Sequence, residues 1–201
     1  YELEMVKNTF RDIIFDPALG GGIVGDKKIK AFIPGGVSAP WFGPDDLDTP
    51  LGQDEVANKA SMLGSGSIVV LDEDSCVVRA AWRITKFFSR ESCGQCTPCR
   101  EGGTWLERIL QRVVDGRGSR ADLDQMLEVG QSICPGNFPH ASSSKLGLEA
   151  TPFPYKMTTI CFVGPSAFAP VHSALTLFRD EFEAKIVERR QIPVTVGAIE
   201  S

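Results

Sequence analysis

Apolar and polar residues alternate in short stretches over the first third of the chain. Alternation at residues 1–5 and 28–33, and a β-branched run at 67–71, each predict a strand. Asn8 or Thr9 can cap a short helix that ends near Phe15. The stretch 35–52 is rich in Gly, Pro and Asp and predicts a loop. The first region therefore predicts a small α+β unit.

The apolar spacing becomes helical after the acidic triplet at residues 72–74. A first helix begins near Asp74 or Ser75, and its stripe consists of Val77, Ala81, Ile84 and Phe88. A second helix begins at Thr97, because Thr97 can cap it and Pro98 suits a first helical position. This second helix extends to the Asp-Gly pair at residues 115–116.

Two further helices complete the pattern. Ser119, with Asp122 three residues later, is a variant of the capping box and predicts a helix that fades near Ile133. A last apolar stripe extends to Ile186 after a start signal at residues 164–166. Four amphipathic helices joined by loops predict a four-helix bundle.

These elements predict a division of the chain into three parts. Residues 1–72 form the first unit and linker, 73–190 form the helical unit, and 191–201 form a tail. The helical unit carries an insertion at 135–156, because this stretch is rich in Pro and Ser and has little periodicity. The fold class is therefore α+β followed by an all-α unit.

Charge and hydropathy narrow the range of partners. The 201 residues are 42% hydrophobic and 23% charged, and the formal net charge is −5. This acidic balance argues against binding to nucleic acid. No apolar stretch reaches the roughly 18 to 20 residues of a membrane span, so any link to a membrane goes through other subunits.

Cysteines supply the chemistry. There are six, at positions 76, 93, 96, 99, 134 and 161, and three of them fall within seven residues. The C-x2-C-x2-C spacing of Cys93, Cys96 and Cys99 lets one loop place three thiolates on a [4Fe-4S] cluster, and Gly94 permits the tight curvature. Structural zinc normally uses separated C-x2-C pairs. The pattern therefore predicts an iron-sulfur cluster that transfers electrons.

The fourth ligand has to come from elsewhere in the chain. Three residues after Cys99 there is only Gly102, and Cys161 and Cys134 are the two candidates. Cys99 is expected in the first turn of a helix, whose free N–H groups and dipole favour an anionic group.

Several motifs carry a resemblance to a known family. The stretches 92–102, 159–167 and 178–183 resemble the C-terminal portion of the NADH-binding flavoprotein subunit of respiratory complex I, which in bacteria is the F subunit of NADH-quinone oxidoreductase. Residues 33–40 are similar to the β-grasp-like (SLBB-type) segment of that family. The resemblance thus implies an incomplete β-grasp-like segment followed by an iron-sulfur helical bundle.

The resemblance also implies roles for particular residues. Cys93, Cys96, Cys99 and Cys161 would ligate the [4Fe-4S] cluster that takes electrons from FMN, with Cys134 kept as the alternative fourth ligand. Phe162 and Val163 become candidates for the wall of the flavin site. The family's N-terminal half, which binds FMN and NAD(H), does not appear in this sequence. We therefore expect a fragment of a longer protein that does not oxidise NADH by itself.

By the same resemblance, the function is electron transfer in the NADH dehydrogenase module of complex I. Hydride from NADH reduces FMN, and the cluster accepts electrons one at a time and passes them toward quinone. The implied partners are other peripheral-arm subunits of complex I, namely the thioredoxin-like E subunit with its [2Fe-2S] centre and the multi-cluster G subunit. The implied location is cytoplasmic, peripherally associated with the inner membrane through the complex.

Two alternatives remain open from the sequence. One is a diaphorase subunit of a soluble NAD-linked hydrogenase or formate dehydrogenase, which resembles the same family. The other belongs to a different class: a zinc-stabilised binding module with no redox role.

Overall fold

Two antiparallel strands organise the N-terminal region of the computed structural model, which describes residues 7–135 and 156–188. Strand β1 (Ile29–Ile33) pairs with β2 (Val69–Asp72), with Ile33 opposite Val69 and Ile29 opposite Asp72. The two strands confirm the predictions at 28–33 and 67–71, with β2 displaced toward its C-terminus. The strand predicted at residues 1–5 lies outside the described residues.

Short helices surround this two-stranded sheet. Helix α1 (Phe10–Phe15) begins with the predicted cap at Thr9, whose side chain accepts from the Asp12 N–H while Asp12 accepts from the Thr9 N–H. The 3-10 helix η2 (Pro44–Asp46) and helix α2 (Gln53–Asn58) were not predicted. Both are too short for a readable apolar period, and Gly43 and Gly52 precede them without a side-chain cap.

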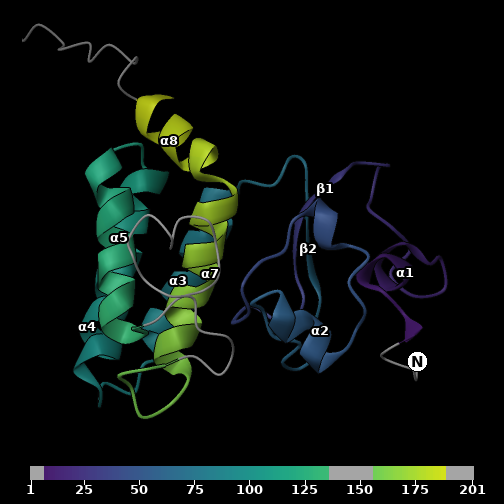
Figure 1. Cartoon of the computed structure of the whole chain (residues 1–201). Coiled ribbons are helices and arrows are strands. Elements are labelled where there is room, and N and C mark those ends of the chain that lie inside the picture. The colour runs from purple at the N-terminus through teal and green to yellow at the C-terminus, as the bar shows by residue number, and fades with distance from the viewer. Residues whose placement is uncertain (1–6, 136–155, 189–201) are drawn as a thin grey trace, which may run out of the picture.

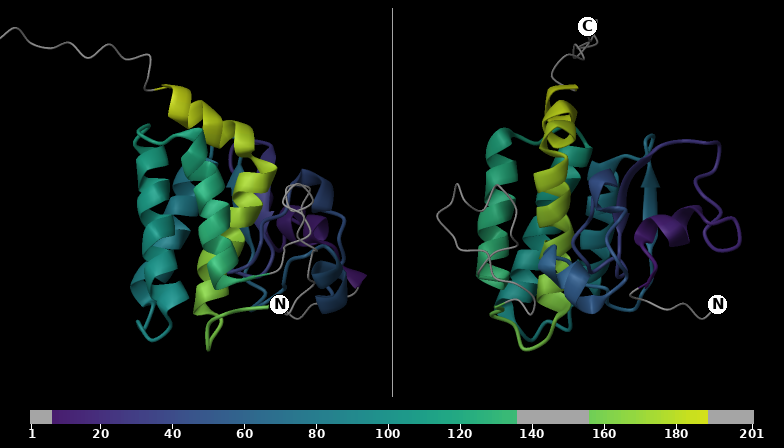
Figure 2. Two further views of the ribbon diagram at one scale, coloured as in Figure 1. Left: turned by 60° about the vertical axis from the view of Figure 1, so that its left-hand side comes forward. Right: turned by 45° about the vertical axis from the view of Figure 1, so that its right-hand side comes forward.

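The C-terminal region is helical. Its elements are α3 (Val77–Glu91), α4 (Thr97–Val114), α5 (Arg120–Ile133), α7 (Val163–Leu177) and α8 (Arg179–Glu188). Helices α3, α4, α5 and α7 pack against one another side by side, and α8 lies across one end of them (Figures 1 and 2). The Ser119–Asp122 capping box of α5 is confirmed, and α4 starts at Thr97 as predicted, but Thr97 is its first helical residue and Cys96 is the N-cap, without a side-chain cap hydrogen bond.

The last predicted helix is in fact two helices. The backbone of Phe178 leaves the helical region (φ −131°, ψ 34°), so α7 ends there and α8 begins in a new direction. The apolar stripe still packs as expected, because Phe182 and Ile186 of α8 are buried in the main core. Periodicity predicts which residues are buried, but a break at one residue leaves the period nearly unchanged.

The strand region and the helices share one core. Ala31, Ile33 and Trp41 belong to the same buried cluster as the inner faces of α3, α4, α5, α7 and α8. The backbone N–H of Trp41 also donates to Ser173 Oγ of α7 over 2.8 Å. A second, smaller cluster around Phe10, Phe32 and Phe42 lies within the strand region. The helices are therefore supported from the side by the sheet (Figure 2).

Among the described residues, none of the helices combines the length and the apolar character that a membrane span requires.

Candidate metal centre

The three motif cysteines lie where α3 passes into α4. Helix α3 ends at Glu91, and Ser92 leaves the helix in an extended conformation. Gly94 has φ +82°, a conformation that glycine adopts without strain, so the loop can turn back on itself. Cys96 is the N-cap of α4 and Cys99 is buried in its first turn. One tight loop thus holds all three thiols at the start of a helix.

Cys161 approaches from the segment that leads into α7. Thr158 Oγ1 donates to the carbonyl oxygens of Ser132 (2.6 Å) and Ile133 (3.0 Å), which fixes this segment to the end of α5. The N–H of Ile160 donates to Cys96 Sγ over 3.3 Å. Residues 64 positions apart in the sequence are therefore joined directly at the motif loop.

A small cavity lies between the two segments, and four of the six cysteines line it. Its volume is about 80 Å³, and its walls are formed by Glu91, Ser92, Cys93, Cys96, Cys99, Thr159, Cys161 and Val163. Cys93 and Cys161 are exposed, whereas Cys99 is buried. The cavity therefore has one side open to solvent and one side against the helix core.

Polar groups at this cavity suit a negatively charged group. The N-terminus of α4 directs its free N–H groups and its dipole toward the loop. Ser92 Oγ lies 3.4 Å from Cys99 Sγ and accepts from the Gly94 N–H over 3.3 Å. Arg100 stabilises the turn by donating from Nη1 to the Gly94 carbonyl over 2.6 Å. Together these contacts hold the loop closed around the thiols and place donors near sulfur.

The set of donors fits a thiolate-ligated cluster. Four thiols on one cavity match the four-cysteine ligation of a [4Fe-4S] cubane. Within the described ranges, no three His, Cys, Asp or Glu side chains are gathered as ligands of one metal ion. A single zinc ion, with Zn–S bonds of about 2.3 Å, needs its sulfurs in close contact, whereas four irons spread their thiolates farther apart. Four thiols that share one cavity without being gathered around a single point therefore fit a four-iron cluster better than one zinc ion.

Cys134 occupies a different environment. It is fully buried, its Sγ donates to the Lys156 carbonyl over 2.9 Å, and it does not line the cavity. Burial raises the pKa of the Cys134 thiol to about 11, so the thiol stays protonated at neutral pH. Cys76 is the N-cap of α3, at the opposite end of that helix from the motif loop. The geometry therefore brings Cys161, and not Cys134 or Cys76, to the motif cysteines.

The residues after Cys161 lie at the edge of this cavity. Val163 lines it, and Phe162 is the N-cap of α7 and packs on the main core. Their predicted contact with a flavin stays a prediction. Thr159 and Ile160 lie in the stretch 159–167 that carries the resemblance, and Glu91 directly precedes the stretch 92–102. Sequence reasoning gave none of the three a role in the site, because a residue that contributes only a backbone N–H or a cavity wall has no signature of its own.

Comparisons with known proteins agree with this geometry. A family model described as the NADH-ubiquinone oxidoreductase-F iron-sulfur binding region matches residues 79–185. The NADH-quinone oxidoreductase F subunit numbered 2 in Rhizobium meliloti (strain 1021) is 38% identical over 190 residues, which are 94% of this chain and 39% of that protein. The corresponding F subunit of Mycobacterium bovis is also 38% identical, over 83% of this chain and 32% of its own length.

Hydrogenase subunits are similar as well. The NADP-reducing hydrogenase subunit HndC of Solidesulfovibrio fructosivorans is 34% identical over 90% of this chain and 32% of its own length. A crystal structure of NAD+-reducing [NiFe]-hydrogenase in the H2-reduced state has the same fold, with a TM-score of 0.66 at 22% identity over 89% of this chain and 26% of that one.

The chain spans about a third of the length of the curated relatives that it matches. The matched region includes α4, α5 and α7 in full, and with them all four cysteines of the cavity. The family match and the relatives at 38% identity together show that the chain belongs to the family of the NADH-quinone oxidoreductase F subunit and carries the iron-sulfur binding region of that family.

Proposed function

We propose that Cys93, Cys96, Cys99 and Cys161 bind a [4Fe-4S] cluster in the NADH dehydrogenase module of a respiratory complex I. The observation that carries the proposal is the convergence of these four cysteines, from two distant segments, on one small cavity. When bound, such a cluster accepts and releases one electron at a time. The chain belongs to an oxidoreductase family in which this chemistry is expected.

The residues of the chain serve to hold and tune the bound group. The four thiolates bind the irons, while the Ile160 N–H and the N-terminus of α4 favour negative charge at the sulfurs. The side chains of Thr159 and Val163 form part of the cavity wall on the α7 side. Through these contacts the fold supplies position and electrostatics, and no side chain has to act as an acid or a base.

The rest of the proposal follows the family. FMN, reduced by NADH, would be bound mainly by a region that this chain does not contain, and Phe162 and Val163 would face it. The neighbouring proteins would be the [2Fe-2S] E subunit and the multi-cluster G subunit, at the cytoplasmic side of the inner membrane, with quinone as the final acceptor. We therefore expect no oxidation of NADH by this chain alone.

The finer architecture belongs to the same proposal. The packing of α3, α4, α5 and α7 supports a four-helix bundle for the unit 73–190, and the β1–β2 pair supports an incomplete β-grasp-like segment before it.

A second candidate function is that of a diaphorase subunit in a soluble hydrogenase. The 34% identity to a NADP-reducing hydrogenase subunit favours it. Purification of the assembled complex distinguishes the two: a quinone-reducing assembly supports complex I, and an H2-dependent reduction of nicotinamide supports the hydrogenase.

The cluster assignment is tested on the anaerobically reconstituted chain. We expect about four irons and four acid-labile sulfides per chain, and an electron paramagnetic resonance signal of a reduced cubane after dithionite. One bound zinc ion and no such signal would instead support a structural zinc module.

A further inference from the structure

The outer face of α3 carries a row of positive charges. Arg79, Arg83, Lys86 and Arg90 follow one another at intervals of four, three and four residues, which places them on one side of a helix. The opposite face of α3 is buried through Val77, Val78, Ala81 and Thr85. The row therefore faces outward along most of the helix.

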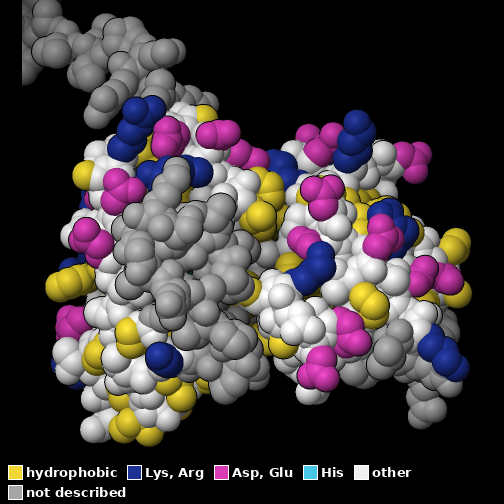
Figure 3. All heavy atoms as spheres, in the orientation of Figure 1, with side chains coloured by type: hydrophobic (Ala, Val, Ile, Leu, Met, Phe, Trp, Pro, Cys, Tyr) yellow, Lys and Arg dark blue, Asp and Glu magenta, His cyan; other side chains and the backbone are white. Residues whose placement is uncertain are grey.

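These four cations differ from many other basic side chains of the chain in their partners. Within residues 7–135 and 156–188, none of the four makes an ion pair, whereas Arg11, Lys27, Lys30, Lys59, Arg100, Arg112, Arg117, Arg120 and Arg179 all do. Like charges three and four residues apart on a helix repel each other. On the face seen in Figure 3, by contrast, acidic and basic side chains lie close together. The repulsion within the row on α3 thus opposes helix stability, and no ion pair to a described carboxylate offsets it.

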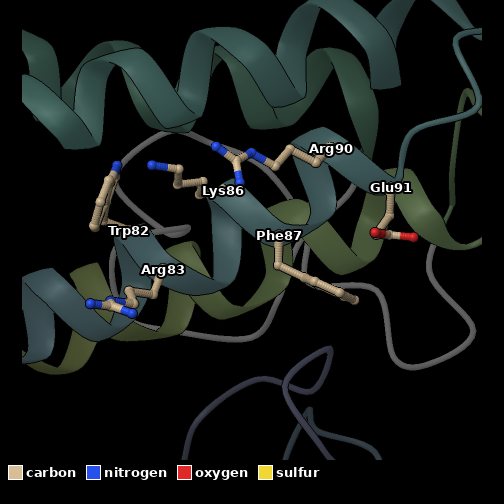
Figure 4. A pocket seen from close by; sticks show the side chains of 6 residues that line it. All are labelled: Trp82, Arg83, Lys86, Phe87, Arg90 and Glu91. Carbon is tan, nitrogen blue, oxygen red and sulfur yellow. The ribbon is translucent and has the colours of Figure 1, made fainter.

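An open hollow of about 490 Å³ lies along this row. The described residues that line it are Trp82, Arg83, Lys86, Phe87, Arg90 and Glu91 of α3 (Figure 4). Phe87 is 50% exposed, and its only ring contact among the described aromatic pairs is edge-on to Phe88. Lys86 Nζ lies 4.5 Å from the centre of the Trp82 ring. Aromatic side chains and Arg side by side, on a surface that solvent reaches, are typical of protein interfaces.

We propose that this face of α3 is a docking surface for an acidic protein surface that presents clustered carboxylates beside an exposed apolar side chain. The carboxylates would pair with Arg83, Lys86 and Arg90, and the apolar side chain would cover Phe87. We choose an acidic partner because its negative charge complements the positive charge of the α3 row.

An extended polyanion fits less well than a compact acidic patch. The row spans about 16 Å, since eleven residues separate its ends at 1.5 Å each, and the formal charge of the chain is −5. Nucleic acid or an anionic bilayer would extend past the row and meet the surrounding carboxylates, which act over roughly a Debye length of 8–10 Å. A patch the size of the row meets mainly the cations, with Glu91 at one end of the hollow.

The surface is continuous with the cysteine site. Glu91 lines both the hollow and the cysteine cavity, and Ser92 and Cys93 follow it directly. A partner bound to α3 therefore lies next to the motif loop. Electron exchange between this partner and the motif loop rests on the proposed function. The docking of the partner on α3 does not.

The test uses the cluster-loaded chain and two synthetic peptides. One peptide presents four Glu and a Phe on one helical face, and its twin has Gln in place of each Glu. We expect the Glu peptide to bind, with an affinity that falls as salt rises, and the Gln twin to bind at least about tenfold more weakly. Isothermal titration measures both.

Paired variants locate the binding. The double variant Arg83→Glu with Arg90→Glu should lower the affinity for the Glu peptide by about tenfold or more. Lys28→Glu with Arg108→Glu changes the net charge equally at exposed positions outside the hollow and should stay within about twofold. Phe87→Ala keeps every charge and should weaken binding a few-fold, so it tests the surface even where a charge reversal disturbs folding.

Several results would overturn the inference. They are the absence of peptide binding, equal binding of the Gln twin, or equal loss in both double variants. Tighter binding to phosphatidylglycerol vesicles than to the Glu peptide, abolished by the same α3 variant, would instead assign the surface to lipid. Iron content is measured in every sample, so failure of the cluster assignment and failure of the docking surface are seen separately.

Discussion

The two ends of the packed helices are held together by different means. At the end covered by α8, Phe182 is fully buried and Ile186 nearly so. Glu183 accepts there from Arg120 (3.0 Å) and Arg179 (3.2 Å), and Lys30 of β1 pairs with Glu181 (3.1 Å). This α8 end is closed by the apolar and charged side chains of the chain itself.

The opposite end, formed by residues 92–99 and 158–163, has fewer buried apolar side chains and ion pairs among its described residues. Two loops meet there through the hydrogen bond from Ile160 to Cys96 and through Thr158 at the end of α5. Cys93, Ile160 and Cys161 are exposed. The α8 end is thus closed by side chains of the chain itself, and we expect the cysteine end to depend on the group that its thiols are proposed to bind.

The largest expected effect is the loss of the cluster in Cys96→Ser. Removal of one of four thiolate ligands should reduce iron and acid-labile sulfide to background. Amide hydrogen exchange should accelerate at 92–99 and 158–163 and stay unchanged at 179–186, because only the cysteine end loses its link. Cys76→Ser, at the N-cap of α3, is the control and should retain the cluster. Unchanged iron content in Cys96→Ser would refute the ligand assignment.

The fourth ligand is tested by a second pair of variants. Cys161→Ser should lose the intact cluster, while Cys134→Ser should keep it, because Cys134 is a buried thiol bonded to the Lys156 carbonyl. A serine hydroxyl can make the same hydrogen bond, so the cost to stability should be about 1 kcal/mol. Iron content and the reduced-state spectrum of both variants provide the measurement. Equal loss in the two would leave the choice between them unsupported.

Much of the helical region was readable from the sequence, and the reason is local. The capping box of α5 joins Ser119 and Asp122, which are three residues apart, and Pro98 lies in the first turn of α4, so local signals marked both helix starts. Helices α2 and η2 were missed because six or fewer residues carry no clear period. The break at Phe178 depends on how α8 packs across the other helices, and this packing is not encoded in the spacing.

The same distinction applies to the candidate site. Cys93, Cys96 and Cys99 followed from spacing alone, whereas the choice of Cys161 needed the resemblance to a family. The burial of Cys134 and the Ile160 hydrogen bond are products of tertiary placement, since they join segments 22 and 64 residues apart. The basic row on α3 was not among the sequence predictions, and its lack of ion pairs within the described residues depends on tertiary placement.

A smaller side chain at Phe182, at the α8 end, should lower the stability of the fold without affecting the cluster. Phe182→Ala removes a fully buried ring from the main core and should lower the free energy of unfolding by about 3–5 kcal/mol. Phe182→Leu conserves most of the volume and should cost under about 1.5 kcal/mol. Denaturant unfolding measures both. At temperatures where Phe182→Ala stays folded, its iron content should equal that of the unaltered chain, and a loss of iron would show that the two ends are not independent.

The smallest effect concerns Asp122 at the start of α5, which also belongs to the α8 end. Its carboxylate accepts from the Ser119 N–H (2.7 Å) and Oγ (2.9 Å) and pairs with Arg112. Partial burial would raise the pKa of Asp122, but the hydrogen bonds from Arg112 and Ser119 outweigh it and hold the pKa below its ordinary 3.8. The ionised form therefore stabilises the fold. This contribution is complete above pH 3.8 and is lost as pH falls through the lowered folded value.

Asp122→Asn should accordingly lower the free energy of unfolding by about 1 kcal/mol at pH 7. The decisive measurement is the same substitution in the Cys96→Ser chain. If the two ends are held independently, the losses add, and Asp122→Asn costs the same with and without the cluster, within roughly 0.5 kcal/mol. A cost that disappears in the cluster-free chain would mean that loosening spreads from the cysteine loop along α4 to Arg112, and that the cluster holds the whole bundle rather than one end.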